Sequence, residues 1–145
     1  MTAHRLTRTV TVNATPAEVW ALIGGFGTLG DWHPYAPQST IEDGADPEVP
    51  GAVRVFAIDG KVVARERLLG REETAYTYAL LDPMVPISDF VATLAVRPHT
   101  DGAEIDWSAD YRAGSDDVVA QLEELFGDGM YGAGLAVLQE KFAGA

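Results

Sequence analysis

Glu66 is the residue whose position in this sequence most clearly suggests chemistry. Along residues 61–68 the even positions hold Val62, Ala64, Glu66 and Leu68, whereas three of the four odd positions are basic. Because successive side chains of a β-strand point to opposite faces, this alternation places Glu66 on the apolar face. An unpaired carboxylate there costs several kcal/mol unless it is protonated, paired or wetted by a cavity. Glu66 is therefore either a rim residue with its head in water or the acid of a functional cavity.

Arg54, on the preceding strand, is the candidate partner of Glu66. The link at residues 59–60 decides whether the two side chains meet. A two-residue turn would separate them and set Arg54 opposite Arg65, which is a repulsive cross-strand pair. A three-residue turn with a glycine bulge would instead place Arg54 and Glu66 together on the concave face. We expect the three-residue turn.

His33 is the third candidate for chemistry, and it directly follows Trp32. A histidine at the lip of a concave sheet can titrate near neutral pH and can donate or accept a proton. Asp31 is close enough in sequence to orient it. A lone histidine is more often structural, so both interpretations stay open. His4 and His99 look like ordinary surface residues.

The composition limits the class of protein. Of the 145 residues, 47% are hydrophobic, so we expect one domain, residues 1–145, with a core of its own. The formal net charge of −12 argues against binding nucleic acid or an anionic membrane surface, because both require Lys or Arg to displace counterions. The expected partner is a small hydrophobic ligand or substrate, and the chain is expected to be a monomer or a homodimer.

Cysteine is absent and only three histidines occur. Disulfides, thiol catalysis and thiolate metal sites are therefore excluded, and we expect neither a metal nor a cofactor. No apolar run approaches the roughly 18–20 residues of a membrane span. Residues 1–8 lack the apolar core of a signal peptide, so a cytoplasmic protein is expected.

The first elements that must position these side chains are a strand and two short helices. Residues 4–13 alternate and are rich in β-branched side chains, which predicts a strand. Thr15, Pro16 and Glu18 form a complete helix start, with a helix to about residue 23, and a second short helix is predicted at 26–32. The latter stretch contains a G-x-G-x-x-G match. It lacks the preceding strand that a dinucleotide site needs, so we interpret it as a link between two helices.

Six further strands and a long helix complete the predicted order. The strands are expected at residues 39–42, 52–58, 62–71, 74–81, 88–98 and 104–112. Short links between them indicate antiparallel neighbours. One antiparallel sheet with an apolar face and one long amphipathic helix fit together most simply when the sheet curls around the helix. The sequence therefore predicts an α+β fold, a seven-stranded antiparallel sheet wrapped around a long C-terminal helix, with two short helices between the first two strands.

The long helix is predicted over residues 115–142, with Ser115 as its N-cap and acidic residues in its first turn. Four glycines in its middle each cost about 0.8–1 kcal/mol relative to alanine, so a break near Gly127 stays open. The i, i+4, i+7 spacing predicts one buried face made of Val118, Leu122, Phe126, Met130, Ala133 and Val137. In the second half Leu135, Leu138 and Phe142 extend the apolar surface to a second side, so we expect that half to be the better buried.

With these elements in order, the chain resembles the START/Bet v 1-like (SRPBCC) helix-grip superfamily, in particular its polyketide cyclase/dehydrase and lipid-transport branch. The resemblance covers nearly the whole chain. Its marks are Pro16-Ala17-Glu18-Val19-Trp20, Trp32-His33-Pro34, Gly51-Ala52-Val53-Arg54, Glu66-Arg67-Leu68, Ile105-Asp106-Trp107, and Gly134-Leu135 with Leu138.

The resemblance implies a cavity between sheet and helix that holds an apolar molecule. Compared with the plant abscisic-acid receptors, a distant branch, His33 falls where a ligand-binding lysine sits and Glu66 where a cavity glutamate sits. We assign catalysis to His33, Glu66 and Arg54. The expected ligand-binding residues are the aromatic and methionine side chains Trp32, Phe56, Tyr78, Phe90, Trp107, Phe126 and Met130.

Two functional classes remain open. The first is a cofactor-independent cyclase, dehydratase or related lyase that acts on a polyketide-like or other small cyclic substrate. In this class His33 or Glu66 moves protons, and Arg54 with a tyrosine polarises a carbonyl. The second is a carrier or sensor of a hydrophobic metabolite, which needs only the pocket.

Overall fold

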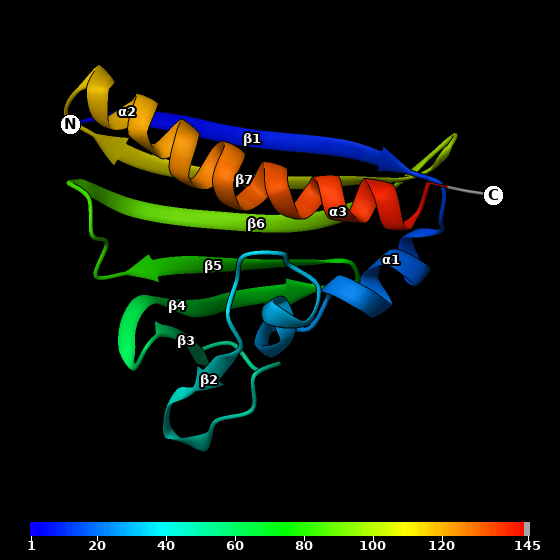
Figure 1. The fold of residues 1–145 in the computed structure, drawn as a ribbon, viewed down its shortest axis with the longest axis horizontal. Helices are drawn as coiled ribbons and strands as arrows, with labels where there is room; N and C mark the ends of the chain where they lie inside the picture. Colours follow the sequence, from blue (N-terminus) through cyan, green and yellow to red (C-terminus); the bar gives the residue numbers. More distant parts are fainter. Residues whose placement is uncertain (144–145) are drawn as a thin grey trace.

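The architecture of the protein, seen in a computed structural model that describes residues 1–143, is one antiparallel sheet around a long helix. The sheet has seven strands in the order β1-β7-β6-β5-β4-β3-β2 (Figure 1). All seven predicted strands are present within a few residues of their expected bounds. These are β1 (Thr2–Val12), β2 (Ser39–Ile41), β3 (Val53–Ile58), β4 (Lys61–Glu72), β5 (Ala75–Leu81), β6 (Ile87–His99) and β7 (Gly102–Ala113).

Two short helices, α1 (Pro16–Ile23) and the 3₁₀ helix η1 (Phe26–Asp31), connect β1 to β2, and a further 3₁₀ turn, η2 (Glu42–Gly44), follows β2. The predicted capping box of α1 is confirmed. The Glu18 backbone N–H donates to the Thr15 hydroxyl, and the Glu18 carboxylate accepts from the Thr15 backbone N–H. These bonds satisfy backbone donors that the helix itself cannot pair. The chain therefore leaves β1 in a fixed direction and closes one end of the sheet with α1 and η1.

The C-terminal helix is continuous from Asp116 to Lys141, so it does not break near Gly127. It consists of α2 (Asp116–Leu122), a π-helical stretch η3 (Glu123–Gly132) and α3 (Ala133–Lys141). Ser115 caps it as predicted, accepting from the Val118 backbone N–H at 3.3 Å. At the other end, the Asn13 backbone N–H donates to the Phe142 carbonyl at 3.0 Å and ties the helix to β1.

The face that this helix buries agrees with the prediction at Leu122, Leu135 and Leu138 and differs from it elsewhere. A π-helix bonds residue i to i+5 instead of i+4, so the helix rotates relative to an α-helix over the same residues. After Leu122 the predicted positions Phe126 and Met130 are only half-buried, as are Ala133 and Val137. The buried positions are Gly127, Tyr131, Gly134, Leu135 and Leu138.

Arg8 of β1 supports the π-helical stretch from the sheet. Its Nη2 donates to the Glu123 carbonyl at 3.4 Å and to the Asp128 carboxylate at 3.1 Å. The guanidinium lies close to the backbone at Gly127, where an added Cβ would be 2.4 Å from Arg8 Nη2. A side chain at this position would therefore displace the Arg8 guanidinium from its place against the helix.

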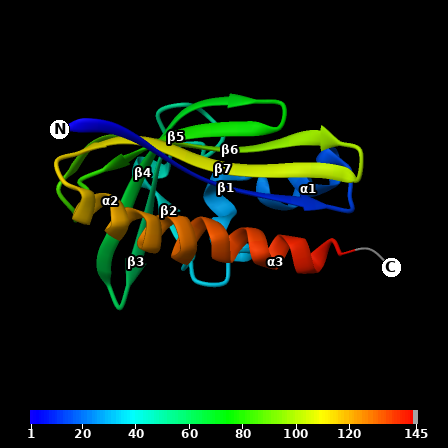
Figure 2. The same cartoon turned by 90° about the horizontal axis from the view of Figure 1, so that it is seen from above.

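The sheet curls so that the helix lies across its concave face, and the β3–β4 hairpin reaches down to the level of the helix (Figure 2). The core between them is dominated by aromatic and aliphatic side chains, among them the fully buried Trp107, Tyr76, Tyr78, Tyr131, Phe26, Leu6, Ile23 and Leu68. Among residues 1–143, none of the helices combines the length and apolar character needed to cross a membrane.

Candidate functional site

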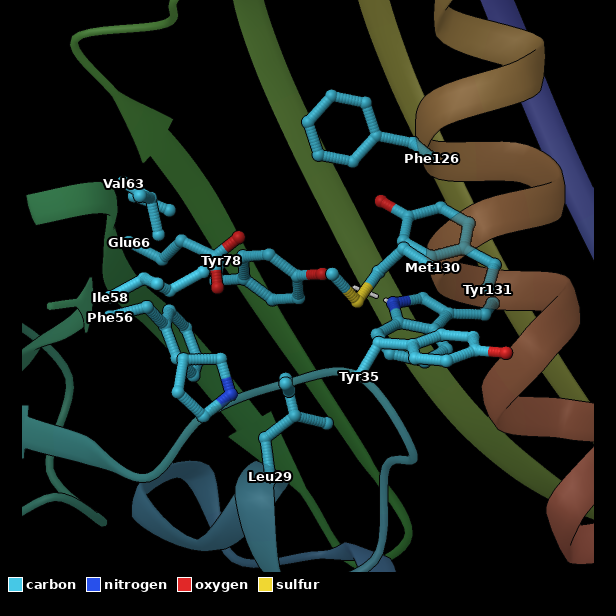
Figure 3. A pocket seen from close by; sticks show the side chains of 14 residues that line it. Leu29, Tyr35, Phe56, Ile58, Val63, Glu66, Tyr78, Phe126, Met130 and Tyr131 are labelled. Carbon is cyan, nitrogen blue, oxygen red and sulfur yellow. Dashed lines mark hydrogen bonds between the residues drawn. The ribbon is translucent and has the colours of Figure 1, made fainter.

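A pocket of about 150 Å³ lies between the concave face of the sheet, the helix segment η3 and the loop that follows η1 (Figure 3). Apart from Glu66 and three tyrosine hydroxyls, its lining is apolar. The lining residues are Leu29, Tyr35, Ala36, Pro37, Phe56, Ile58, Val63, Ala64, Glu66, Tyr78, Trp107, Phe126, Met130 and Tyr131.

Arg54 and Glu66 are directly opposite each other on β3 and β4, so their predicted pairing is confirmed. The predicted three-residue turn is wrong. Asp59 and Gly60 form a two-residue turn with positive φ angles of 54° and 79°, and Ile58 pairs with Lys61. Asp59 tolerates this left-handed conformation better than most residues, and Gly60 adopts it freely.

A β-bulge at Val63 restores the pairing that this tight turn would otherwise prevent. Ala57 pairs with Val62 and Phe56 with Ala64, which leaves Val63 as the extra residue. From Ala64 onward the register is therefore shifted by one residue. The bulge also overturns one detail of the predicted alternation, since Val62 is exposed to solvent and Val63 lines the pocket instead.

Arg54 is completely buried, at 0% exposure, and its guanidinium is held on several sides. Nε donates to Glu66 Oε1 at 2.8 Å, and Nη2 lies 2.8 Å from the same oxygen. Nη1 donates to the Phe26 carbonyl at 2.9 Å and to the Tyr76 hydroxyl at 3.2 Å. The guanidinium carbon also lies 4.2 Å from the Phe26 ring centroid and 4.7 Å from that of Tyr78, within cation–π range. Arg54 is thus a fixed cation behind the pocket wall and does not itself line the pocket.

Glu66 brings a negative charge to the pocket. Arg54 engages Oε1, whereas no hydrogen bond from any of the described residues engages Oε2. Glu66 is the one carboxylate among the lining residues, and it stands on the sheet side, near Phe56 and Tyr78 (Figure 3). This arrangement leaves one carboxylate oxygen available to accept a proton or a hydrogen bond from a bound molecule.

Two buried tyrosines also line the pocket, Tyr78 from β5 and Tyr131 from the helix segment η3. Trp107 Nε1 donates to the Tyr78 hydroxyl at 3.1 Å, and the Trp107 ring stacks on Tyr131 with centroids 4.5 Å apart and an interplanar angle of 15°. Burial raises the pKa of Tyr78 and that of Tyr131, and the negative charge of Glu66 acts in the same direction on both. Both hydroxyls therefore stay protonated at neutral pH and can donate.

His33 lies outside the pocket lining, and both of its ring nitrogens are engaged. Nδ1 accepts from the backbone N–H groups of Tyr35 and Ala36, at 3.1 and 3.2 Å, so Nε2 carries the proton and donates to the Met130 carbonyl at 2.6 Å. Burial lowers the pKa of His33, and the bond to Met130 opposes that shift. This bonding gives His33 a positioning role between the loop and the helix. Its catalytic assignment stays a prediction.

Asp31 does not orient His33, so that expectation is wrong. Its carboxylate accepts from the Gln38 side-chain amide at 2.8 Å instead. Of the predicted ligand-binding residues, Trp32 and Phe90 also lie outside the lining. Trp32 packs 5.9 Å from the Trp107 ring, and Phe90 packs behind the pocket, 5.1 Å from the Phe126 ring. The structure brings together Glu66 with Phe56, Tyr78, Trp107, Phe126 and Met130.

Several of the lining residues are not among the site residues predicted from the sequence. Tyr131 is the most important of these, because it is polar and fully buried. In an α-helix Tyr131 and Phe126 would not lie on the same face, whereas the i+5 step of a π-helix places them together. The glycines around Tyr131 are the signal in the sequence that the helix is irregular here. The other unassigned lining residues are Leu29, Tyr35, Ala36, Pro37, Ile58, Val63 and Ala64.

Comparisons with known proteins agree with this architecture. A protein from Thermobifida fusca, solved in solution by NMR, is 36% identical, with a TM-score of 0.86, and the match covers 95% of this chain and 92% of that one. A protein from Bacillus thuringiensis is 29% identical, with a TM-score of 0.76 over 97% and 100% of the two chains. Norcoclaurine synthase from Thalictrum flavum, a point mutant in complex with a transition-state analogue, is 14% identical, with a TM-score of 0.72 over 98% and 95%. No curated protein matches the chain.

The sheet, the helix and the pocket between them define a helix-grip protein. The family model for polyketide cyclase/dehydrase and lipid transport matches residues 3–143. The chain therefore belongs to that family, whose fold suggests hydrophobic ligand binding.

Proposed function

We propose that the protein binds a small hydrophobic molecule in this pocket and acts on it by acid–base chemistry through Glu66. The observation that carries the proposal is the free Oε2 of Glu66 in an otherwise apolar pocket. Burying a carboxylate there costs several kcal/mol, and Arg54 offsets much of that cost. A pocket that only excluded water would be served as well by an apolar residue at this position.

The size of the pocket supports a compact ligand. A volume of about 150 Å³ is comparable to that of a cavity that holds benzene, and it is below the roughly 300–1,000 Å³ of sites for larger ligands. A single ring with a short substituent fits this description. A fused polycyclic molecule would require the wall formed by Tyr35, Ala36 and Pro37 to open.

Glu66 is suited to removing a proton from carbon next to a carbonyl, or to assisting the loss of water from a neighbouring carbon, as in cyclase and dehydratase reactions. Arg54 would hold Oε1 and so fix the direction in which Oε2 faces the ligand. The apolar walls would keep bulk water from competing for the proton. Arg54 acts here as a positioning residue, because the wall separates it from the ligand.

A carrier or sensor of a hydrophobic metabolite is the second candidate. The hydrogen bonds of His33 favour this function, because both ring nitrogens are engaged and His33 does not line the pocket. Glu66 therefore has no histidine beside it in the pocket to act as a second acid or base. Binding alone would need the apolar lining and one polar group to orient the ligand.

One experiment separates these functions. Acetophenone, a single-ring ketone, is incubated with the protein in D₂O, its binding is followed by NMR titration, and exchange of its methyl protons is followed by ¹H NMR. We expect the wild type to bind acetophenone and to accelerate the exchange, and Glu66→Gln to bind it without accelerating exchange. Glu73→Gln, which makes the same change at an exposed turn, is the control and should match the wild type. Binding of acetophenone by the wild type without faster exchange would contradict the enzyme and support the carrier or sensor. Absence of binding would contradict both functions.

A further inference from the structure

The hydroxyl of Tyr131 is buried beside the pocket, and the proposed chemistry of Glu66 does not explain why a polar group is there. The side chain is 1% exposed, and among the described residues its hydroxyl makes no hydrogen bond of normal distance and angle, although it lies close enough to the Tyr78 hydroxyl for that group to raise the pKa of Tyr131. A buried donor without a partner costs about 1–3 kcal/mol, so such groups are rare and call for a cause. Within residues 1–143, four other buried side-chain atoms are also without a hydrogen bond, and of these five atoms only that of Tyr131 belongs to a residue that lines the pocket.

The position of this hydroxyl is fixed by the helix and by the sheet. The π-helical stretch turns Tyr131 onto the buried face, and the stack on Trp107 holds the plane of its ring. Figure 3 shows the ring reaching from the helix toward the Tyr78 side of the pocket, with the hydroxyl between Phe126 and Tyr78. The hydroxyl is therefore held in a fixed place beside the pocket and the Tyr78 hydroxyl, and it is covered from solvent in the free protein.

Tyr78 of β5 provides a second donor, from the sheet. Its oxygen accepts the indole N–H of Trp107, and among the described residues the neighbour of its own proton is the Tyr131 hydroxyl. Trp107 thus fixes both hydroxyls, one by a hydrogen bond and the other by stacking. Glu66, which is near Tyr78 on the sheet, presents only an acceptor to the pocket.

We propose that Tyr131 and Tyr78 form a two-donor site for one oxygen atom of the ligand, and that the ligand is a single-ring carbonyl compound. This inference rests on the proposed function, because it assigns the substrate class of the same pocket. The carbonyl oxygen accepts from the two hydroxyls, and the carbon next to the carbonyl faces Glu66. When Glu66 takes a proton from that carbon, the electron pair of the C–H bond moves into the C–C bond and the carbonyl π pair moves onto the oxygen. The two hydroxyls stabilise the resulting enolate oxygen.

The test uses two probes of nearly the same shape, acetophenone and α-methylstyrene, which differ in having a carbonyl oxygen or a CH₂ group. Their dissociation constants are measured by NMR titration, following the tryptophan indole N–H signals of the wild type, Tyr131→Phe and Tyr111→Phe. Tyr111→Phe is the matched control, because it too removes a buried hydroxyl without a partner, but outside the pocket. Thermal unfolding of the three proteins is measured in parallel.

We expect the wild type and Tyr111→Phe to prefer acetophenone, and Tyr131→Phe to lose that preference by a factor of about 2–10. The melting temperature of Tyr131→Phe should be unchanged or higher, since the removed hydroxyl is buried and its contact with the Tyr78 hydroxyl falls short of a normal hydrogen bond. A clearly lower melting temperature would show a structural role for the hydroxyl and overturn the inference. So would an unchanged preference in Tyr131→Phe while both probes bind. If α-methylstyrene and acetophenone both fail to bind the wild type, the proposed function itself fails.

Discussion

Replacing Arg54 with methionine tests whether the site depends on a buried cation. Methionine fills a similar volume with a flexible apolar chain, so the main change is the loss of charge and of donors. Glu66 then stays at 7% exposure without its partner, and the Phe26 carbonyl and the Tyr76 hydroxyl each lose a hydrogen bond. The substitution therefore leaves a charge and two polar groups uncompensated in the core.

The expected cost follows from these losses. Removing one partner of a buried ion pair costs about 3–5 kcal/mol. Because the free energy of unfolding of a domain of this size is only about 5–15 kcal/mol, Arg54→Met should lose about a fifth of its stability or more. Glu66→Gln should cost less, about 1–3 kcal/mol, since Arg54 keeps an amide oxygen, the Phe26 carbonyl and its aromatic neighbours. The double variant should be more stable than Arg54→Met, because it no longer buries an unpaired charge.

Urea denaturation at pH 7, followed by circular dichroism, measures all three variants against the wild type. The coupling free energy from the double-mutant cycle should be about 1–3 kcal/mol. Strictly additive losses, or a cost below about 1 kcal/mol for Arg54→Met, would refute the view that the pair is buried and coupled. In that case Glu66 would be solvated by water that reaches the pocket.

Two further substitutions test the contact between the loop, the sheet and the helix. His33→Asn removes the titrating ring. Because burial lowers the pKa of His33 in the folded protein, the unfolded chain binds the proton more readily, so this histidine should reduce stability as pH falls below its usual value of about 6.5. Melting temperatures from pH 7 to 5 should fall less steeply in His33→Asn, and equal slopes would contradict this. Gly134→Ala should destabilise by about 1–3 kcal/mol in urea, because the new Cβ would lie 2.8 Å from His33 Cδ2 and 3.2 Å from the Trp107 ring. The control is Gly129→Ala at an exposed position, whose Cβ would meet only the Glu124 carbonyl at 3.3 Å, and it should cost less than Gly134→Ala.

The elements and their ends could be predicted because local signals and tertiary structure agree at those positions. The capping box at Thr15, the cap at Ser115 and the alternation along the strands each report a local preference that the fold preserves. The pairing of Arg54 with Glu66 followed from two further facts, the cost of a charge on an apolar face and the repulsion that the other register would create. The positions of these residues could be predicted because a helix cap, or a charge on an apolar face, is compatible with few local structures.

The hydrogen bonding of His33 could not be predicted, because it depends on contacts across the fold. Its Nε2 meets a carbonyl of the C-terminal helix at Met130, and its Nδ1 caps the backbone of the following loop. Neither partner is visible as a pattern in the sequence. The resemblance to ligand-binding proteins placed His33 near a ligand, and the structure places it instead where it joins the loop and the helix that form the pocket.

The two errors of register share one physical origin. The bulge at Val63 adds a residue to β4, and the π-helical stretch moves the helix from an i+4 to an i+5 step. Periodic patterns cannot anticipate such steps, which interrupt a regular element at a cost in local hydrogen bonding. In this protein the first step brings Glu66 opposite Arg54, and the second turns Tyr131 to the pocket. Both irregularities therefore place a polar side chain, Glu66 or Tyr131, in the lining of the same pocket. Departures from regular structure are expected at functional sites, and in this protein both of them occur at the pocket.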